Sequence, residues 1–212
     1  MSENPVPLVE LLEKVNSGMA RTKLQAIKSL RLLSEGSPEL LYPHFAFFAN
    51  LLRSNNGILR WNSMLVIGNL ARVDCGRNIE RIIEEYLAPI TGPLLIDAAS
   101  TIQGAAEIAL AKPHLADQIA KRILRVADTT YKTPECRNVA IGHAITALNR
   151  LFPTLTDKPA IQRFVAGQAN NKRPATRKRA EKFLHKWAGV PAQARLCRTA
   201  RPKPISSTEP RA

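Results

Sequence analysis

Few side chains in this chain have the types and spacing that catalysis or metal binding requires. No two of the four histidines lie one helical turn apart, so the paired-histidine zinc motif of a helix is absent. The cysteines are far apart and odd in number, which predicts neither a zinc site nor a disulfide framework and fits a reducing compartment. These residues are His44, His114, His143 and His185, and Cys75, Cys136 and Cys197. We therefore expect no metal, no cofactor and no small-molecule substrate.

The glycines form no recognisable phosphate-binding or nucleophile motif. A Walker-type loop, a dinucleotide-binding G-x-G-x-x-G and a G-x-S-x-G sequence are all absent. Gly68, Gly104 and Gly142 lie instead inside segments of helical pattern, where glycine costs about 1 kcal/mol relative to alanine. We expect these three glycines to allow close approach of neighbouring helices, and we expect the protein not to be an enzyme.

Charge is the property that points to a partner. The chain has 31 Lys/Arg and 17 Asp/Glu, a net charge of +14. Residues 1–110 hold 10 basic and 11 acidic residues, whereas residues 111–212 hold 21 and 6. A basic patch is formed by Lys172, Arg173, Arg177, Lys178, Lys182, His185 and Lys186. A localised excess of this kind favours an acidic partner, which could be a protein or a nucleic acid.

The composition of the chain predicts that helices position the basic and candidate-site side chains. The chain has 28 Ala and 25 Leu against 11 aromatic residues, which favours helices over strands. No run of about 18 apolar residues occurs, so we expect no contact with a membrane. The first residues also lack the basic and apolar regions of a secretory signal. We expect a cytoplasmic protein, or a nuclear one if the source is a eukaryote.

Gly, Pro and Asn-Asn interrupt the chain at short intervals, and the segments between them have helical apolar spacing. These segments form five pairs: 6–15 with 20–34, 39–53 with 58–72, 77–89 with 94–111, 114–128 with 135–151, and 158–168 with 174–188. Ser37-Pro38 and Thr133-Pro134 are typical of a helix N-terminus, where a hydroxyl caps the helix and proline occupies its first position.

The second segment of each pair repeats a pattern: a basic residue, a small anchor residue three positions later, and apolar residues four and seven positions beyond the anchor. These anchor residues are Ala26, Ser63, Thr101, Ala140 and Ala180. The third pair fits the pattern loosely, because it lacks the basic residue that precedes the anchor in the others. Successive anchors recur at a period of about 40 residues, and helical hairpins with this period predict an α-solenoid.

This arrangement resembles the HEAT and armadillo families, and the stretch ILRWNSMLVIGNLARVD at residues 58–74 looks like the second helix of a HEAT repeat. The predicted fold class is therefore all-α, a HEAT-like α-solenoid of about five helical hairpins that occupies residues 1–188 as one domain. Residues 189–212 contain four prolines and five Lys/Arg and predict a disordered basic tail.

The resemblance implies that the second helices line a concave surface. On that ground Trp61, Leu65 and Arg72 are candidate groove residues, and Asn138 and Asn149 are the corresponding positions further along the chain. A core position is the competing interpretation of Trp61. With the basic patch at its far end, the predicted groove has an apolar and aromatic end and a basic end.

Three functions are compatible with the sequence. The first, which we favour, is a non-enzymatic, monomeric scaffold that binds a protein or peptide of acidic character in its concave groove. The second is nucleic-acid binding by the basic C-terminal half through phosphate contacts. The third rests on a resemblance in architecture to alkylpurine DNA glycosylases of the AlkD type, whose chemistry requires an acidic residue, aromatic residues and an arginine. Asp74, Trp61 and Arg72 are the nearest candidates, and no family motif maps onto them.

Overall fold

The predicted all-helical fold is confirmed. The computed structural model describes residues 7–17 and 19–189, and within these ranges the chain forms helices and no strand. The predicted tail lies outside the described residues, apart from Gly189. None of the helices in the described ranges is long and apolar enough to cross a membrane.

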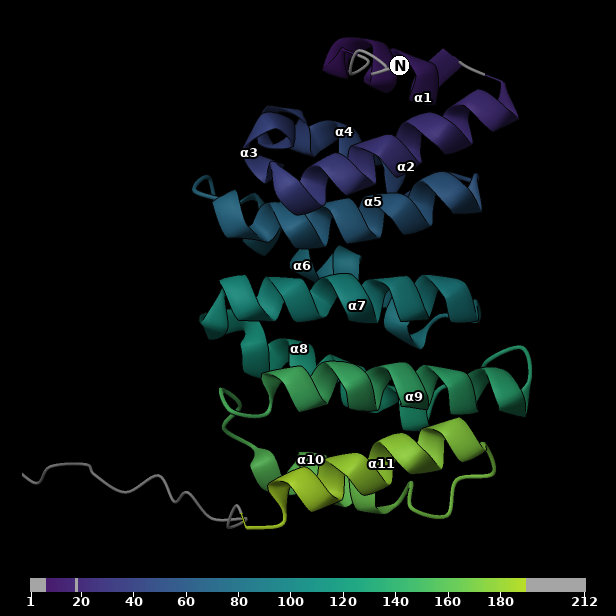
Figure 1. Cartoon of the computed structure of the whole chain (residues 1–212), viewed down its shortest axis with the longest axis vertical. Coiled ribbons are helices and arrows are strands. Elements are labelled where there is room, and N and C mark those ends of the chain that lie inside the picture. Colours follow the sequence, from purple (N-terminus) through teal and green to yellow (C-terminus); the bar gives the residue numbers. More distant parts are fainter. Residues whose placement is uncertain (1–6, 18, 190–212) are drawn as a thin grey trace, which may run out of the picture.

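Two layers of helices stack into a solenoid, and the second helices of the pairs lie in front in Figure 1. The second helices are α2 (Ala20–Gly36), α5 (Gly57–Leu70), α7 (Leu95–Ala111), α9 (Pro134–Leu151) and α11 (Pro174–Trp187). The first helices are α1 (Leu8–Ser17), α3 (Pro38–Leu41) with α4 (Phe45–Leu51), α6 (Asn78–Leu87), α8 (Ala116–Leu124) and α10 (Lys158–Ala166). The 3-10 turns Tyr42–His44, Ala71–Val73, Ala88–Thr91, Pro113–Leu115 and Arg125–Ala127 join or extend them.

Local chemistry explains most helix boundaries. The Thr133 hydroxyl accepts a hydrogen bond from the Cys136 amide at 3.1 Å, which confirms the predicted cap of α9. The prediction for Ser37 is half right, because α3 begins at Pro38 but the Ser37 side chain makes no capping hydrogen bond. Pro43 lies in the 3-10 turn between α3 and α4, where its missing N–H breaks the predicted single helix into two.

The repeat period is confirmed by burial. The five anchor residues Ala26, Ser63, Thr101, Ala140 and Ala180 are all between 0 and 2% exposed. They belong to the second helices, which pack against one another in chain order and against the first helices behind them. One continuous hydrophobic core therefore extends from the first pair to the last.

Close helix approach explains the glycines of α5 and α7, as predicted. A Cβ atom on Gly68 would lie 2.6 Å from the Cα atom of Gly104, and one on Gly104 would collide with the Tyr86 hydroxyl. That hydroxyl donates a 2.6 Å hydrogen bond to the Met64 carbonyl in the middle of α5. Because glycine has no Cβ atom at these two positions, α5, α6 and α7 can pack against one another at the same place.

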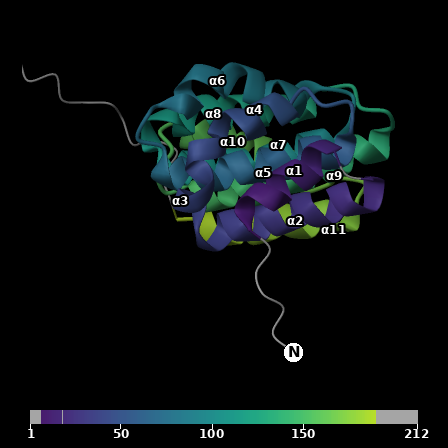
Figure 2. The same cartoon turned by 90° about the horizontal axis from the view of Figure 1, so that it is seen from above.

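The stack is curved, and its concave side is the layer of second helices. Seen from above, α2 and α11 at the two ends lie further forward than α7 in the middle (Figure 2). The first helices form the convex side, with α6 and α8 furthest from α2 and α11. This curvature agrees with the placement of the second helices that the HEAT resemblance implies.

Candidate functional site: the concave face

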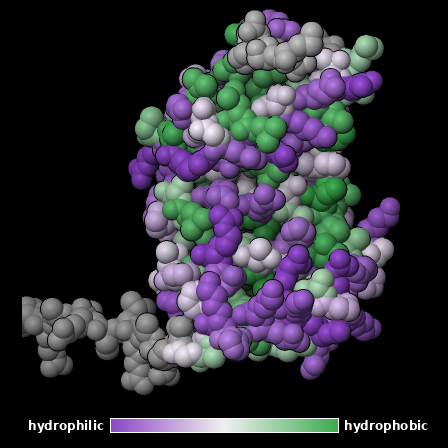
Figure 3. Space-filling view, viewed as in Figure 1, coloured by the Kyte–Doolittle hydropathy of each residue, from purple (hydrophilic) through white to green (hydrophobic). Residues whose placement is uncertain are grey.

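Charge is divided between the two layers as well as along the chain. The five second helices carry 12 Lys/Arg and 5 Asp/Glu, whereas the first helices carry 6 and 7. Hydrophilic side chains cover much of the concave face, most densely over its lower part, where α9 and α11 lie (Figure 3). The concave layer is therefore the cationic layer of the molecule.

A hollow of about 440 Å³, which we call the α5–α7 hollow, opens on this face. Leu65 and Asn69 of α5 and Gln103 and Glu107 of α7 line it, and Arg72 lies at one end. The Arg72 guanidinium is oriented by the end of α2, because its Nη2 donates to the Glu35 carbonyl at 2.9 Å and to that of Ser34 at 3.2 Å. No carboxylate pairs with Arg72 among the described residues, so its charge is available to a ligand.

A second hollow of about 220 Å³, the α7–α9 hollow, lies beside the first and shares Gln103 with it. His143, Thr146 and Arg150 of α9 form one wall. Arg150 Nη1 lies 2.7 Å from Glu107 Oε1, so this ion pair stands between the two hollows. Burial lowers the pKa of His143, and the positive charges of Arg179 and Arg173 lower it further, which favours the neutral imidazole.

The predicted groove residues do not all face this surface. Leu65 and Arg72 line the α5–α7 hollow together. Trp61 is half-buried, and its indole N–H donates to the Asp97 carboxylate, so neither the groove nor the core interpretation describes it fully. Asn149 accepts a 2.9 Å hydrogen bond from the Trp187 indole, and Asn138 accepts one from Thr176 through its carbonyl. Both asparagines therefore join α9 to α11.

The basic patch is partly used in packing. Arg173 forms an ion pair with Glu135, and Arg177 donates to the Asn171 carbonyl at 2.9 Å, so these two residues hold the turn before α11. The Lys186 ammonium lies 4.7 Å from the centre of the Trp187 ring. The remaining members are exposed to solvent: Lys172, Lys178, Lys182 and His185.

The candidate carboxylate of the glycosylase interpretation is already bound by its neighbours. Asp74 accepts from the Tyr42 hydroxyl at 2.8 Å and from the amides of Asn78 and Ile79, and the Lys112 ammonium lies 3.0 Å away. Burial opposes ionisation of Asp74, but hydrogen bonds from Lys112 and Tyr42 outweigh it and lower the pKa. Trp61 lies near the other end of α5, so Asp74 and Trp61 do not converge.

The structure adds concave residues that the sequence did not single out, chiefly Arg31, Gln103, Glu107 and Arg150. Gln103 and Glu107 stand two and six residues after the anchor Thr101, as Leu65 and Asn69 do after Ser63, so this signal could have found them. Arg150 stands ten residues after Ala140 and does not follow that spacing. In the described ranges, no group of three or more His, Cys, Asp or Glu residues could hold a metal ion.

Comparison with known proteins supports the architecture. No family model matches the chain, and no curated protein sequence matches it. Among solved structures, the chain is similar to TOG3 of Mini spindles from Drosophila melanogaster, a HEAT-repeat domain. The TM-score is 0.50 and the sequence identity 14%, and the match covers 87% of this chain and 84% of that chain. At this identity the likeness shows the fold, an all-α solenoid of HEAT-like architecture.

Proposed function

We propose that this protein is a non-enzymatic scaffold that binds a protein or peptide of acidic character on its concave face. The observation that carries the proposal is the segregation of charge, since the concave layer has 12 basic residues against 5 acidic ones. Arg72 and Arg150 line its two adjoining hollows, where Arg150 is paired with Glu107. The last helix of the same layer, α11, carries Lys178, Lys182 and Lys186. Potentials of opposite sign would steer and orient such a partner.

The buried carboxylates already accept hydrogen bonds from the protein itself, which supports a binding function rather than catalysis. Asp74 and Asp97 are the buried acidic residues of the described ranges, and each is held by several donors from the protein itself. The three cysteines are far apart and odd in number, which supports a reducing compartment such as the cytoplasm. We also propose that the chain works as a monomer and that residues 1–188 act as one domain.

The test is binding of a polyglutamate peptide to the full chain and to two matched variants. The concave variant, Arg72→Gln with Arg150→Gln, removes two charges from the hollows and leaves Glu107 without its partner. The convex control, Arg81→Gln with Lys121→Gln, removes two exposed charges from α6 and α8. Ion pairs of this kind contribute about 0.5–1 kcal/mol each, so we expect the concave variant to bind about five- to thirtyfold more weakly. Equal losses in both variants would contradict the proposed site.

Nucleic-acid binding is the second candidate, and the exposed lysines of α11 are the observation that favours it. Lys178, Lys182 and Lys186 recur one helical turn apart on this helix, and each could contact a phosphate. A DNA duplex bound in this way would lose affinity with salt at a slope of about −0.9 per phosphate contact. Duplex binding that exceeds polyglutamate binding, and that disappears when these lysines become glutamine, would favour this candidate over the first.

A further inference from the structure

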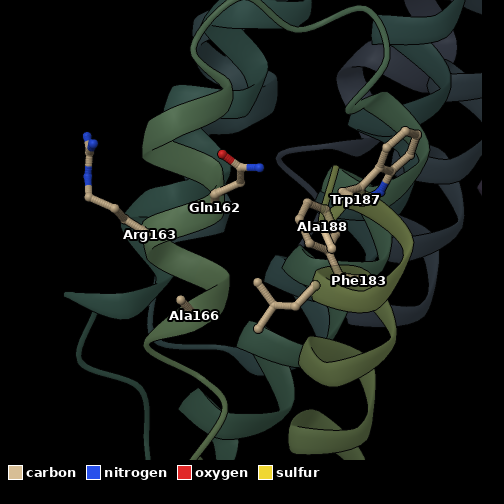
Figure 4. A pocket seen from close by; sticks show the side chains of 7 residues that line it. Gln162, Arg163, Ala166, Phe183, Trp187 and Ala188 are labelled. Carbon is tan, nitrogen blue, oxygen red and sulfur yellow. The ribbon is translucent and has the colours of Figure 1, made fainter. Parts of the chain in front are cut away.

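The last helix pair leaves an apolar pocket at the C-terminal end of the stack (Figure 4). Ala166 and Gln162 of α10 form one wall, and Phe183, Leu184 and Trp187 of α11 form the other. In Figure 4 Phe183 and Trp187 of α11 lie across the gap from Gln162 and Ala166 of α10. The pocket has a volume of about 280 Å³. We call it the end pocket.

The walls of the end pocket are held in place before any partner arrives. The Trp187 indole donates to Asn149 at 2.9 Å, and the Trp187 ring packs 4.9 Å from that of Phe152. Phe183 is 1% exposed and lies 5.0 Å from the same Phe152 ring. A preformed wall of this kind binds a ligand without ordering its own side chains first.

The repeated packing of one helix pair on the next indicates which kind of ligand fits the end pocket. At the preceding pair, α8 with α9, the apolar surface is covered by the next helices, whose Ile161, Val165 and Phe183 are all buried. After α11, no further element covers the corresponding surface among the described residues. The exposed gap therefore occupies the place where another helix would pack in a continuing solenoid.

The end pocket is small. At about 280 Å³ it is close to the lower limit of small-molecule sites, which usually enclose about 300–1,000 Å³. It is large enough for apolar side chains that project from one face of a helix. Such side chains recur every three or four residues along one face of a helix.

Charge around the end pocket specifies the flanks of that helix. Arg163 lines the pocket on the α10 side, and Lys186 stacks over Trp187 on the α11 side. Arg163 and Lys186 are both exposed, and Glu181 is the one acidic residue of α11. The rim is therefore positive and complements an acidic surface.

We propose that the end pocket docks an amphipathic helix of a protein partner, with apolar residues on the face that enters the pocket and Asp or Glu on its flanks. The site lies at the end of the solenoid, so it is a second contact surface beyond the concave face. Its occupant is defined by shape, apolar area and negative charge together.

A synthetic peptide of about 18 residues tests this proposal, with leucine at helical spacing and glutamate on both flanks. A second peptide has lysine in place of every glutamate. NMR of the indole N–H groups in the full chain reports the site, because Trp187 lines the end pocket and Trp61 does not. We expect the acidic peptide to shift the Trp187 signal and leave that of Trp61 unchanged, and we expect the lysine peptide to bind at least about tenfold more weakly.

Variants separate the end pocket from the concave face. Ala166→Arg fills the pocket from an exposed position on α10, so it should block the peptide without harming the fold. Arg163→Glu reverses the rim charge and should weaken the acidic peptide while strengthening the lysine peptide. The concave variant, Arg72→Gln with Arg150→Gln, should bind the helical peptide as the parent does. The binding of the helical peptide to the end pocket is expected whether or not polyglutamate binds the concave face.

Two results would overturn the proposal. The first is peptide binding that survives Ala166→Arg or that leaves the Trp187 signal in place. The second is self-association of the unliganded chain that Ala166→Arg abolishes, since the occupant would then be a second copy of this protein. Analytical ultracentrifugation over a range of concentrations measures that outcome.

Discussion

The ammonium group of Lys112 lies 3.0 Å from the carboxylate of Asp74, and the two residues stand one repeat of the solenoid apart in the sequence. Its second partner, Glu80, is 3.1 Å away. The Lys112 side chain is 10% exposed and that of Asp74 is fully buried, so water screens this pair very little. Because Asp74 also accepts from the first amides of α6, one buried carboxylate ties the ends of three helices together.

Replacement of Lys112 by methionine should strongly destabilise the protein. The change keeps an apolar stem of similar length and removes the cation, which leaves Asp74 buried without its partner. Loss of one partner of a buried pair costs about 3–5 kcal/mol, and we expect a value near the lower limit because Tyr42 still donates to Asp74. Urea unfolding measures the change. Lys121→Met, at an exposed position on α8, is the control and should change stability by less than about 0.5 kcal/mol.

The same cluster predicts how stability responds to acid. The pKa of Asp74 is lower in the folded chain than the ordinary value, so the folded state binds fewer protons than the unfolded state as the pH falls. The stability that ionised Asp74 contributes is complete at pH values above its unfolded pKa of about 4, and it is lost as the pH falls through the folded pKa. Lys112→Met should raise the pKa of Asp74 and move this loss to higher pH. Unfolding midpoints between pH 2 and 6 would test it, and parallel curves for parent and variant would contradict it.

A methyl group on Gly104 should disrupt the contact between α5, α6 and α7. The added Cβ would lie 2.6 Å from the Met64 carbonyl oxygen and would displace the Tyr86 hydroxyl from its hydrogen bond. Overpacking of a core costs about 1–3 kcal/mol, and loss of the Tyr86 bond adds to that. We therefore expect Gly104→Ala to lower the free energy of unfolding by about 3 kcal/mol in urea denaturation.

Gly36→Ala is the matched control for that prediction. A Cβ on Gly36 meets no atom within 4 Å, and the residue is the last one of α2. Because alanine reduces the entropy of the unfolded chain, this change should be neutral or stabilise by up to about 1 kcal/mol. A Gly104→Ala protein as stable as the Gly36→Ala protein would mean that the helices separate at little cost.

The repeat architecture was predictable because its signal is local and repeated. Each second helix has one small residue at an equivalent buried position, so the anchors recur at nearly constant spacing. Prolines and glycines mark the turns, and most predicted helix ends lie within a few residues of the observed ones. The break at Pro43 was missed because the apolar spacing continues across it.

The candidate site was harder to predict than the fold, because the side of a helix on which a residue lies depends on how the helix is rotated about its axis. One residue turns a helix by about 100°, so Asn149 contacts Trp187 of α11 while Arg150 beside it lines a concave hollow. The spacing of the anchors grows slightly from each repeat to the next, and a period that drifts in this way cannot fix rotation to that accuracy. Pairs such as Lys112 with Asp74 are also invisible in sequence, since each residue alone is typical of a helix end.

His143 provides a local probe of the concave face. Burial lowers its pKa below the ordinary value of about 6.5, and Arg179 and Arg173 add to the effect. Arg179→Gln removes one of these charges and should raise the pKa of His143, which NMR titration of the imidazole would measure. His143→Gln assigns the signal. A pKa that does not respond to Arg179→Gln would mean that the charge of Arg179 does not reach the α7–α9 hollow.

The same titration connects stability with binding. Because the folded chain binds fewer protons at His143 than the unfolded chain, His143 makes the protein less stable as the pH falls below about 6.5. An acidic ligand in the α7–α9 hollow places negative charge beside the imidazole, so polyglutamate should raise the pKa of His143 and bind more tightly at pH 6 than at pH 8. His143→Gln should abolish that difference in affinity. A polyglutamate complex in which the pKa of His143 is unchanged would place the acidic partner outside this hollow.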